Sequence, residues 1–101
     1  MDAVFEILAE PNRRRILDLL RAGERPAGDI VSALDISQPG VSKHLRILRE
    51  AGLVGTRRDG QRRLYCLRAE GLAELDEWLA PYRAFWSEGL DALETHLRRE
   101  S

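Results

Sequence analysis

Apolar residues in the first half of the chain recur at the three- and four-residue intervals of amphipathic helices. The clearest case begins at Pro11, places Ile16, Leu19 and Leu20 on one side, and ends at Gly23. Proline suits the first turn of a helix, and glycine commonly follows the last turn. The same spacing predicts three further helices, at residues 2–10, 27–34 and 37–51.

The pattern changes after the fourth of these helices. Two strand-like runs, residues 53–58 and 62–67, flank the turn Asp59-Gly60-Gln61. Asp-Gly between two such runs is a strong hairpin signal, because glycine readily adopts the positive φ that these turns require. The segment therefore predicts a β-hairpin, in which we expect Tyr65 to pack underneath.

The last third of the chain carries large apolar residues at intervals of three and four. They are Leu72, Leu75, Leu79, Tyr82, Trp86, Leu90, Leu93 and Leu97. This near-heptad seam predicts a long helix from about Ala69 to Arg99, which Pro81 either kinks or splits in two. The order of elements predicts a mostly α fold with a small β-hairpin, namely a winged helix–turn–helix with additional terminal helices.

The length and composition fit one soluble domain over residues 1–101. No apolar run approaches the roughly 18 residues of a membrane span, and the N-terminus lacks the basic region of a signal peptide. A single cysteine, Cys66, cannot form an internal disulfide, which agrees with a reducing compartment. We therefore expect a cytoplasmic protein with no membrane association.

Charge is strongly segregated along the chain, although the net charge is only −1. Residues 37–68 hold eight basic and two acidic side chains, whereas residues 69–101 hold three basic and eight acidic ones. A polyanion meets one face of a protein and not its average charge, so the basic middle segment favours nucleic acid as a partner.

The turn Asp35-Ile36-Ser37 is the short joint of a helix–turn–helix over residues 27–51. In this motif the second helix lies in the DNA major groove, where Gln38 suits adenine and a basic side chain suits guanine or phosphate. Ser37 either caps the helix alone or contacts DNA as well. The DNA contacts predicted on this helix are Ser37, Gln38, Ser42, Lys43, His44 and Arg46.

Two further basic clusters flank this helix in the sequence. Four arginines surround the hairpin turn and repel one another unless a polyanion neutralises them: Arg57, Arg58, Arg62 and Arg63. They indicate a wing, residues 53–67, that reaches the minor groove or its phosphates. The run Arg13-Arg14-Arg15 either contacts phosphates or forms ion pairs within the protein.

Three stretches carry a family pattern: LAEPNRRRILDLL, ISQPGVSKHLRILREAGLV and RRDGQRRLYCL. In them, and over nearly the whole chain, the sequence resembles the ArsR/SmtB family of bacterial winged-helix repressors. The resemblance implies a cytoplasmic, homodimeric transcriptional repressor that binds an imperfect inverted repeat in double-stranded DNA near a promoter. It also implies DNA contacts at Ser37, Gln38, Ser42, Lys43, His44 and the wing arginines.

The resemblance further implies dimerisation through the first and last helices, residues 1–10 and 69–101, as the apolar seam also suggests. The dimerisation residues expected on these helices are Val4, Phe5, Leu8, Leu79, Tyr82, Trp86, Leu90, Leu93 and Leu97. Trp78, Phe85 and Trp86 cluster near Pro81. They form either part of the dimer core or an aromatic pocket for a small molecule between the dimer helices.

The chain departs from the metal-sensing members of the resembled family. The third helix reads AGDIVSAL and lacks the Cys-x-Cys of the best-known sensors, and the final helix has a single histidine, His96, beside acidic residues. We expect neither a metal site nor a cofactor. Cys66 is either a half-buried strand residue or a redox switch. The effector, if one exists, does not follow from the sequence.

The main alternative is a winged helix that binds an acidic protein partner through its arginines. That function explains the basic hairpin but leaves the Ser, Gln, Lys and His pattern of the fourth helix without a purpose. An enzyme is not expected, because the sequence has no phosphate-binding glycine loop, paired carboxylates or nucleophile–base set.

Overall fold

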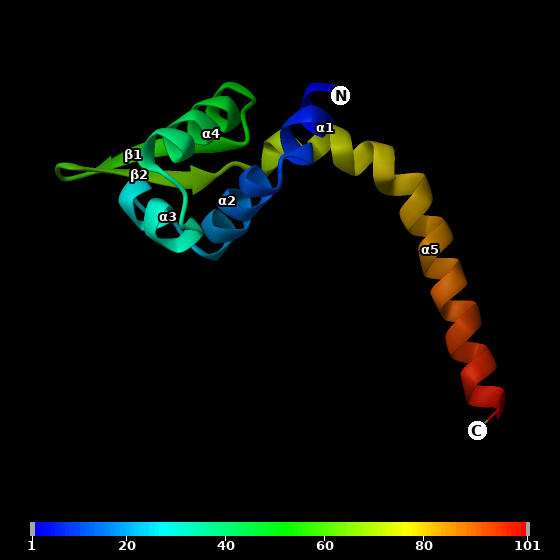
Figure 1. Cartoon of the computed structure of the whole chain (residues 1–101). Coiled ribbons are helices and arrows are strands. Elements are labelled where there is room, and N and C mark those ends of the chain that lie inside the picture. Colours follow the sequence, from blue (N-terminus) through cyan, green and yellow to red (C-terminus); the bar gives the residue numbers. More distant parts are fainter. Residues whose placement is uncertain (1, 101) are drawn as a thin grey trace.

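The computed structural model describes residues 2–100 and shows a helical body, a two-stranded wing and one protruding helix (Figure 1). The bounds of its elements are α1 Asp2–Ala9, α2 Pro11–Ala22, α3 Ala27–Leu34, α4 Gln38–Glu50, β1 Val54–Asp59, β2 Arg62–Leu67, the 3-10 turn η1 Ala69–Leu72 and α5 Ala73–Glu100. The prediction of a mostly α fold with a small β-hairpin is confirmed.

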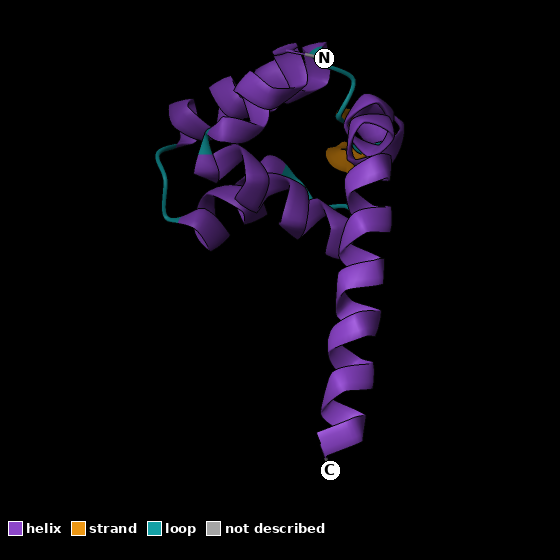
Figure 2. Cartoon of the chain, turned by 90° about the vertical axis from the view of Figure 1, so that its right-hand side faces the viewer, coloured by secondary structure: helices purple, strands orange, loops and turns teal. Residues whose placement is uncertain are grey.

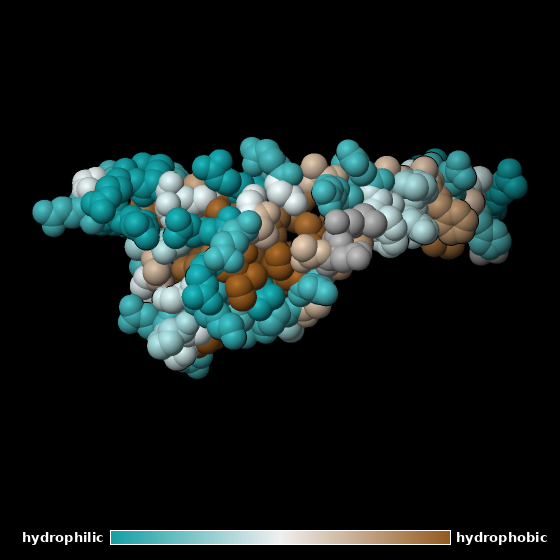
Figure 3. All heavy atoms as spheres, turned by 90° about the horizontal axis from the view of Figure 1, so that it is seen from above, coloured by the Kyte–Doolittle hydropathy of each residue, from teal (hydrophilic) through white to brown (hydrophobic). Residues whose placement is uncertain are grey.

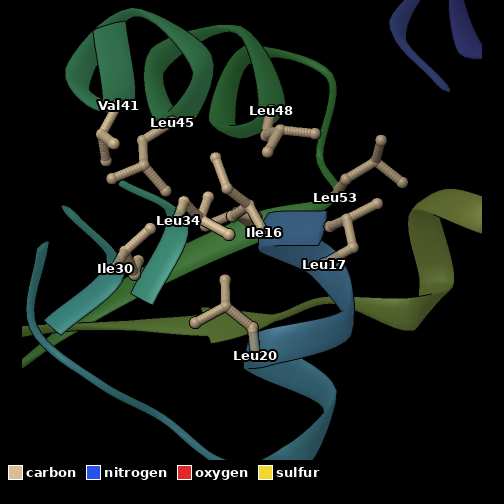
Figure 4. Close-up of a cluster of buried hydrophobic side chains, with 10 residues drawn as sticks. Ile16, Leu17, Leu20, Ile30, Leu34, Val41, Leu45, Leu48 and Leu53 are labelled. Atoms are coloured by element: carbon tan, nitrogen blue, oxygen red, sulfur yellow. The ribbon is translucent and has the colours of Figure 1, made fainter. Parts of the chain in front are cut away.

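The hydrophobic core lies where α2, α3 and α4 meet. Helix α4 turns Val41, Leu45 and Leu48 inward, and each of them is at most 2% exposed. They point toward Ile16 of α2 and Leu34 of α3 (Figure 4). Burial of one such side chain is worth about 1.5–3 kcal/mol. These contacts therefore determine which side of α4 stays exposed.

The joint between α3 and α4 is held by backbone geometry and one cap. Asp35 adopts the left-handed conformation (φ 55°), and its N–H donates to the carbonyl of Val31 at 3.1 Å. The hydroxyl oxygen of Ser37 accepts from the Gly40 N–H at 3.2 Å, which confirms Ser37 as the N-cap. A Cβ at Gly40 would lie 3.0 Å from Ile36 Cγ2, so the tight joint favours glycine there.

The wing is an antiparallel hairpin whose strands pair from Val54↔Leu67 to Asp59↔Arg62. Of the two turn residues, Gly60 has a positive φ of 66°, as in II′ turns. The loop after α2 adds a short bridge, in which Arg25 and Tyr65 exchange backbone hydrogen bonds of 3.2 and 2.9 Å. The half-buried Tyr65 packs against the core, as expected.

Helix α5 is one continuous element with Pro81 in its interior, so the proline does not split it. The helix bends in its yellow first half, which contains Pro81 (Figure 1). Its second half stands away from the body in both views (Figures 1 and 2). The radius of gyration, 18.0 Å, accordingly exceeds the roughly 13 Å of a compact chain of 100 residues.

The protruding part of α5 exposes a stripe of large apolar side chains. The exposed fractions are 73% for Phe85, 53% for Trp86, 66% for Leu90, 54% for Leu93 and 57% for Leu97. No helix within residues 2–100 is long and apolar enough to cross a membrane.

Shortening Leu48 tests the coupling of α4 to the core. Leu48→Ala removes a side chain that is fully buried, and we expect it to lower the free energy of unfolding by about 2–5 kcal/mol. Urea or thermal denaturation followed by circular dichroism measures the change. Arg46→Ala, on the exposed side of the same helix, is the control and should change stability by less than about 0.5 kcal/mol. Equal effects of the two variants would contradict the described packing.

Candidate nucleic-acid interface

One side of α4 is polar and exposed. Gln38, Ser42 and Arg46 follow one another at four-residue intervals and so share one face of the helix, with the exposed Lys43 beside them. The single acid of α4, Glu50, is its last residue and continues the same four-residue series one turn after Arg46, at the end of the helix opposite Gln38. Amide, hydroxyl and cationic side chains in this arrangement can donate to base edges and phosphates.

Ser37 precedes this face and is exposed although its oxygen caps the helix. A hydroxyl that accepts one hydrogen bond can still donate another. Both interpretations of Ser37 given above are therefore compatible with its geometry.

His44 is placed differently from the other predicted contacts. Its side chain is 14% exposed, and Nδ1 accepts a hydrogen bond from Arg13 Nε at 3.3 Å. Nε2 lies 3.7 Å from Glu10 Oε2 at the start of α2. The ring faces the protein, so its geometry gives no support to the expectation of a direct DNA contact. The helical period explains the difference, because His44 lies three residues after Val41 and four before Leu48, both of which are core positions.

The basic run at the start of α2 is engaged within the protein. Arg13 donates to His44, and Arg14 Nη1 donates to the carbonyl of Leu8 at 2.7 Å. Arg15 Nη1 donates to Asn12 Oδ1 at 3.2 Å. These contacts favour an intramolecular role over phosphate binding.

The four wing arginines are all exposed, and three of them lie at the end of the hairpin. Arg58 and Arg63 are directly opposite each other in the strand register, and Arg62 pairs with Asp59. Like charges that face each other across two strands destabilise a hairpin, and a polyanion relieves this repulsion. Figure 3 shows the hairpin end as a mostly hydrophilic projection at the left.

Arg57 differs from the other three arginines because it has an acidic partner. Its Nε donates to Glu24 Oε2 at 2.6 Å, across 33 residues of sequence. This hydrogen bond lowers the pKa of Glu24 below its usual value and raises the pKa of Arg57 above its own. The pair supports the folded state above the ordinary carboxyl pKa, and this contribution disappears as the pH falls through the lowered value.

Sequence reasoning missed both the Glu24–Arg57 pair and the Arg25–Tyr65 bridge. The segment GERP was recognisable only as the turn that follows α2. The bridge carries this turn to the edge of the wing, where Glu24 meets Arg57. A local sequence pattern cannot reveal pairs so distant.

Metal-binding side chains do not converge in the described part of the chain. Within residues 2–100 no group of three or more His, Cys, Asp or Glu residues is arranged to hold a metal ion. Cys66 is a free, half-buried thiol in β2 and is paired in register with Gly55. His96 lies on the exposed part of α5.

A tight helix–turn–helix with an acid-poor outer face and a basic hairpin together define the winged helix–turn–helix class of DNA-binding proteins. The comparisons with known proteins identify the family within this class. The family described as "Bacterial regulatory protein, arsR family" matches residues 10–56. The transcriptional repressor SdpR of Bacillus subtilis is 40% identical over 79 residues, which cover 78% of this chain and 88% of the relative.

Two solved structures extend the similarity to the fold. The crystal structure of a possible transcriptional regulator for arsenical resistance has 43% identity and a TM-score of 0.65, and the match covers 87% of this chain and 88% of that one. The homodimeric winged helix–turn–helix DNA-binding domain of a possible ArsR-family regulator from Mycobacterium bovis has 34% identity and a TM-score of 0.65, with 82% and 77% covered. The chain belongs to the arsR family and is a DNA-binding transcriptional regulator.

Removing Glu24 tests its competition with DNA for Arg57. Glu24→Gln takes away the carboxylate that holds Arg57, so we expect tighter binding to duplex DNA of random sequence. If Arg57 then reaches a phosphate, the slope of log affinity against log salt steepens by about 0.9. A fluorescence anisotropy titration at several salt concentrations measures both quantities. Glu6→Gln, which removes the same charge from α1, is the control, and equal effects of the two variants would contradict a specific competition.

Proposed function

We propose that the protein is a homodimeric repressor that binds an inverted-repeat operator. Each subunit places the exposed face of α4 in the major groove and the wing against the adjacent minor groove or its phosphates. Two-fold symmetry then requires half-sites whose centres are about one helical turn, 10–10.5 base pairs, or a multiple of it apart. The proposed contacts are Ser37, Gln38, Ser42, Lys43, Arg46, Arg58, Arg62 and Arg63, with Arg57 joining them once it leaves Glu24.

The observation that carries this proposal is the division of α4 into two sides. Leu45 and Leu48 are fixed in the core, whereas Gln38, Ser42 and Arg46 are presented to solvent on one face. Core packing therefore orients the polar face from behind, as base readout by a recognition helix requires. The arginine-rich wing adds the sequence-independent attraction to phosphates.

The proposed dimer is supported by the apolar surface that α1 and α5 share. Phe5 and Trp78 join the two helices at a ring-centroid distance of 5.5 Å, and Tyr82 lies 4.9 Å from Trp78. The exposed stripe of α5 continues from this cluster toward the C-terminus. A second copy supplies the same stripe, and self-complementary burial is the usual basis of a two-fold interface. The homodimeric domain from Mycobacterium bovis supports this assembly.

The other predicted dimerisation residues are less exposed in the single chain. Val4, Leu8 and Leu79 are half-buried, and Leu8 packs against the core of its own subunit. We propose that they contribute at the edge of the interface, whereas the stripe from Trp86 to Leu97 forms its centre.

Selection of bound duplexes from a random pool tests the DNA-binding mode. We expect the wild-type protein to enrich an inverted repeat. Gln38→Ala should relax base preference at one position of each half-site and weaken binding there by about 1–3 kcal/mol. The double variant Arg62→Ala/Arg63→Ala should instead weaken binding to all sequences and lower the salt dependence.

The selection also separates the repressor from the alternative function. An unchanged sequence profile for Gln38→Ala would refute the proposed readout. A wild-type protein that enriches no sequence, but binds an acidic peptide in a salt-dependent manner, would favour the protein-interaction module.

A charge placed in the apolar stripe tests the dimer. Leu93→Lys puts an ammonium group at the centre of the proposed interface, where burial without a partner is strongly unfavourable. We expect the particle mass in sedimentation equilibrium to fall from twice the chain mass to the 11.5 kDa of one chain. Thr95→Lys, on the opposite side of the same exposed helix, should remain dimeric. A dimeric Leu93→Lys protein would contradict the assignment of the interface.

A further inference from the structure

A three-residue cluster connects the recognition helix to the corner between α1 and α2. Helix α1 ends at Ala9 and α2 begins at Pro11, so Glu10 is the single residue that separates them. Glu10 caps α2 by accepting from the Arg13 N–H at 3.1 Å. The side chains of Glu10 and Arg13 both meet His44, which lies in the middle of α4.

One hydrogen bond shows which nitrogen of the imidazole acts as the acceptor. Because Nδ1 accepts from Arg13 Nε at 3.3 Å, the ring proton of the neutral tautomer is on Nε2. Nε2–H then faces Glu10 Oε2 at 3.7 Å. One ring thus meets a donor on one side and a carboxylate on the other, an arrangement that is sensitive to the position of α4 relative to α2.

Burial separates this role from direct DNA recognition. The His44 side chain is 14% exposed, whereas Lys43 and Arg46 on either side of it are exposed to solvent. A ring in contact with Arg13 and Glu10 would have to give up both contacts before it could reach a base. Its polar atoms are directed at the protein and not at the face that carries Gln38 and Ser42.

We propose that His44 is a positioning residue for DNA recognition: the Glu10–His44–Arg13 cluster holds α4 at the orientation in which its outer face fits the major groove. The proposal rests on the DNA-binding mode proposed above. According to this proposal, contacts within the protein contribute to DNA affinity although none of the three residues touches a nucleotide. It also provides a physical link between the recognition helix and α1, because Glu10 directly follows the last residue of α1.

The test uses the duplex that the wild-type protein selects from the random pool, measured by fluorescence anisotropy. His44→Leu keeps an apolar side chain in the space but removes both polar contacts. We expect it to weaken binding about tenfold, which corresponds to about 1.4 kcal/mol. The salt dependence should not change, because no phosphate contact is lost.

Two companion variants distinguish positioning from a general loss of structure. His44→Gln restores an acceptor for Arg13 and a donor toward Glu10, so it should recover most of the affinity. Arg13→Met removes the partner from the α2 side and should weaken binding in the same way as His44→Leu. The double variant His44→Leu/Arg13→Met should lose less binding free energy than the sum of the two single losses, since both substitutions disrupt the same contact.

Arg15→Met is the matched control, because Arg15 lies on the same helix but contacts Asn12. It should bind like the wild type. Circular dichroism at the assay temperature establishes that each variant is folded. If His44→Leu is unfolded, the DNA affinities of the other variants test the proposal. Arg13→Met should then bind more weakly than both His44→Gln and the control Arg15→Met.

Several outcomes would overturn the proposal. Unchanged affinity of His44→Leu or of Arg13→Met would show that the cluster does not position α4. Additive losses, together with an altered base preference for His44→Leu, would make His44 a direct contact. Failure of the wild-type protein to select any DNA would instead overturn the proposed function and not this inference alone.

Discussion

The burial of one apolar stripe of α4 is the constraint on which the rest of the structure depends. Val41, Leu45 and Leu48 can reach the core formed with α2 and α3 only if the opposite side of the helix faces water. Packing in the core thus orients the polar face toward solvent, and the polar side chains themselves do not contribute to this orientation. A binding surface oriented in this way can vary in its outer residues while the scaffold behind it stays the same.

Hydrogen bonds and one ion pair within the protein distinguish the engaged arginines from those that remain for a polyanion. The arginines at the start of α2 are engaged by neighbouring groups, and Arg57 is engaged by Glu24. Arg58, Arg62 and Arg63 lie at the hairpin end, where like charges face each other in the strand register. A count of basic residues does not distinguish arginines that have partners within the protein from arginines that are available to a polyanion. The contacts in the structure make this distinction.

The fold was largely predictable because its signals are local. Helical spacing predicted α2 and α4, and the Asp-Gly pair predicted the hairpin. Ser37 indicated the start of the recognition helix. The side chain of His44 was not predictable in this way, since its partners lie 31 and 34 residues away in sequence. Nor could the spacing alone decide whether Pro81 bends or divides α5, because neighbouring turns determine whether a helix tolerates a proline.

The outer half of α5 has consequences for how the protein behaves at different concentrations. An isolated helix of fewer than about 12–15 residues is only marginally stable in water. No other element of the described residues 2–100 lies beside this half of α5. In the proposed dimer, its order is therefore linked by mass action to the encounter of two chains. At low cellular concentration the protein would be monomeric, and the outer half of α5 would be frayed. The concentration of the protein would then determine how much of it is in the dimeric form that can regulate transcription.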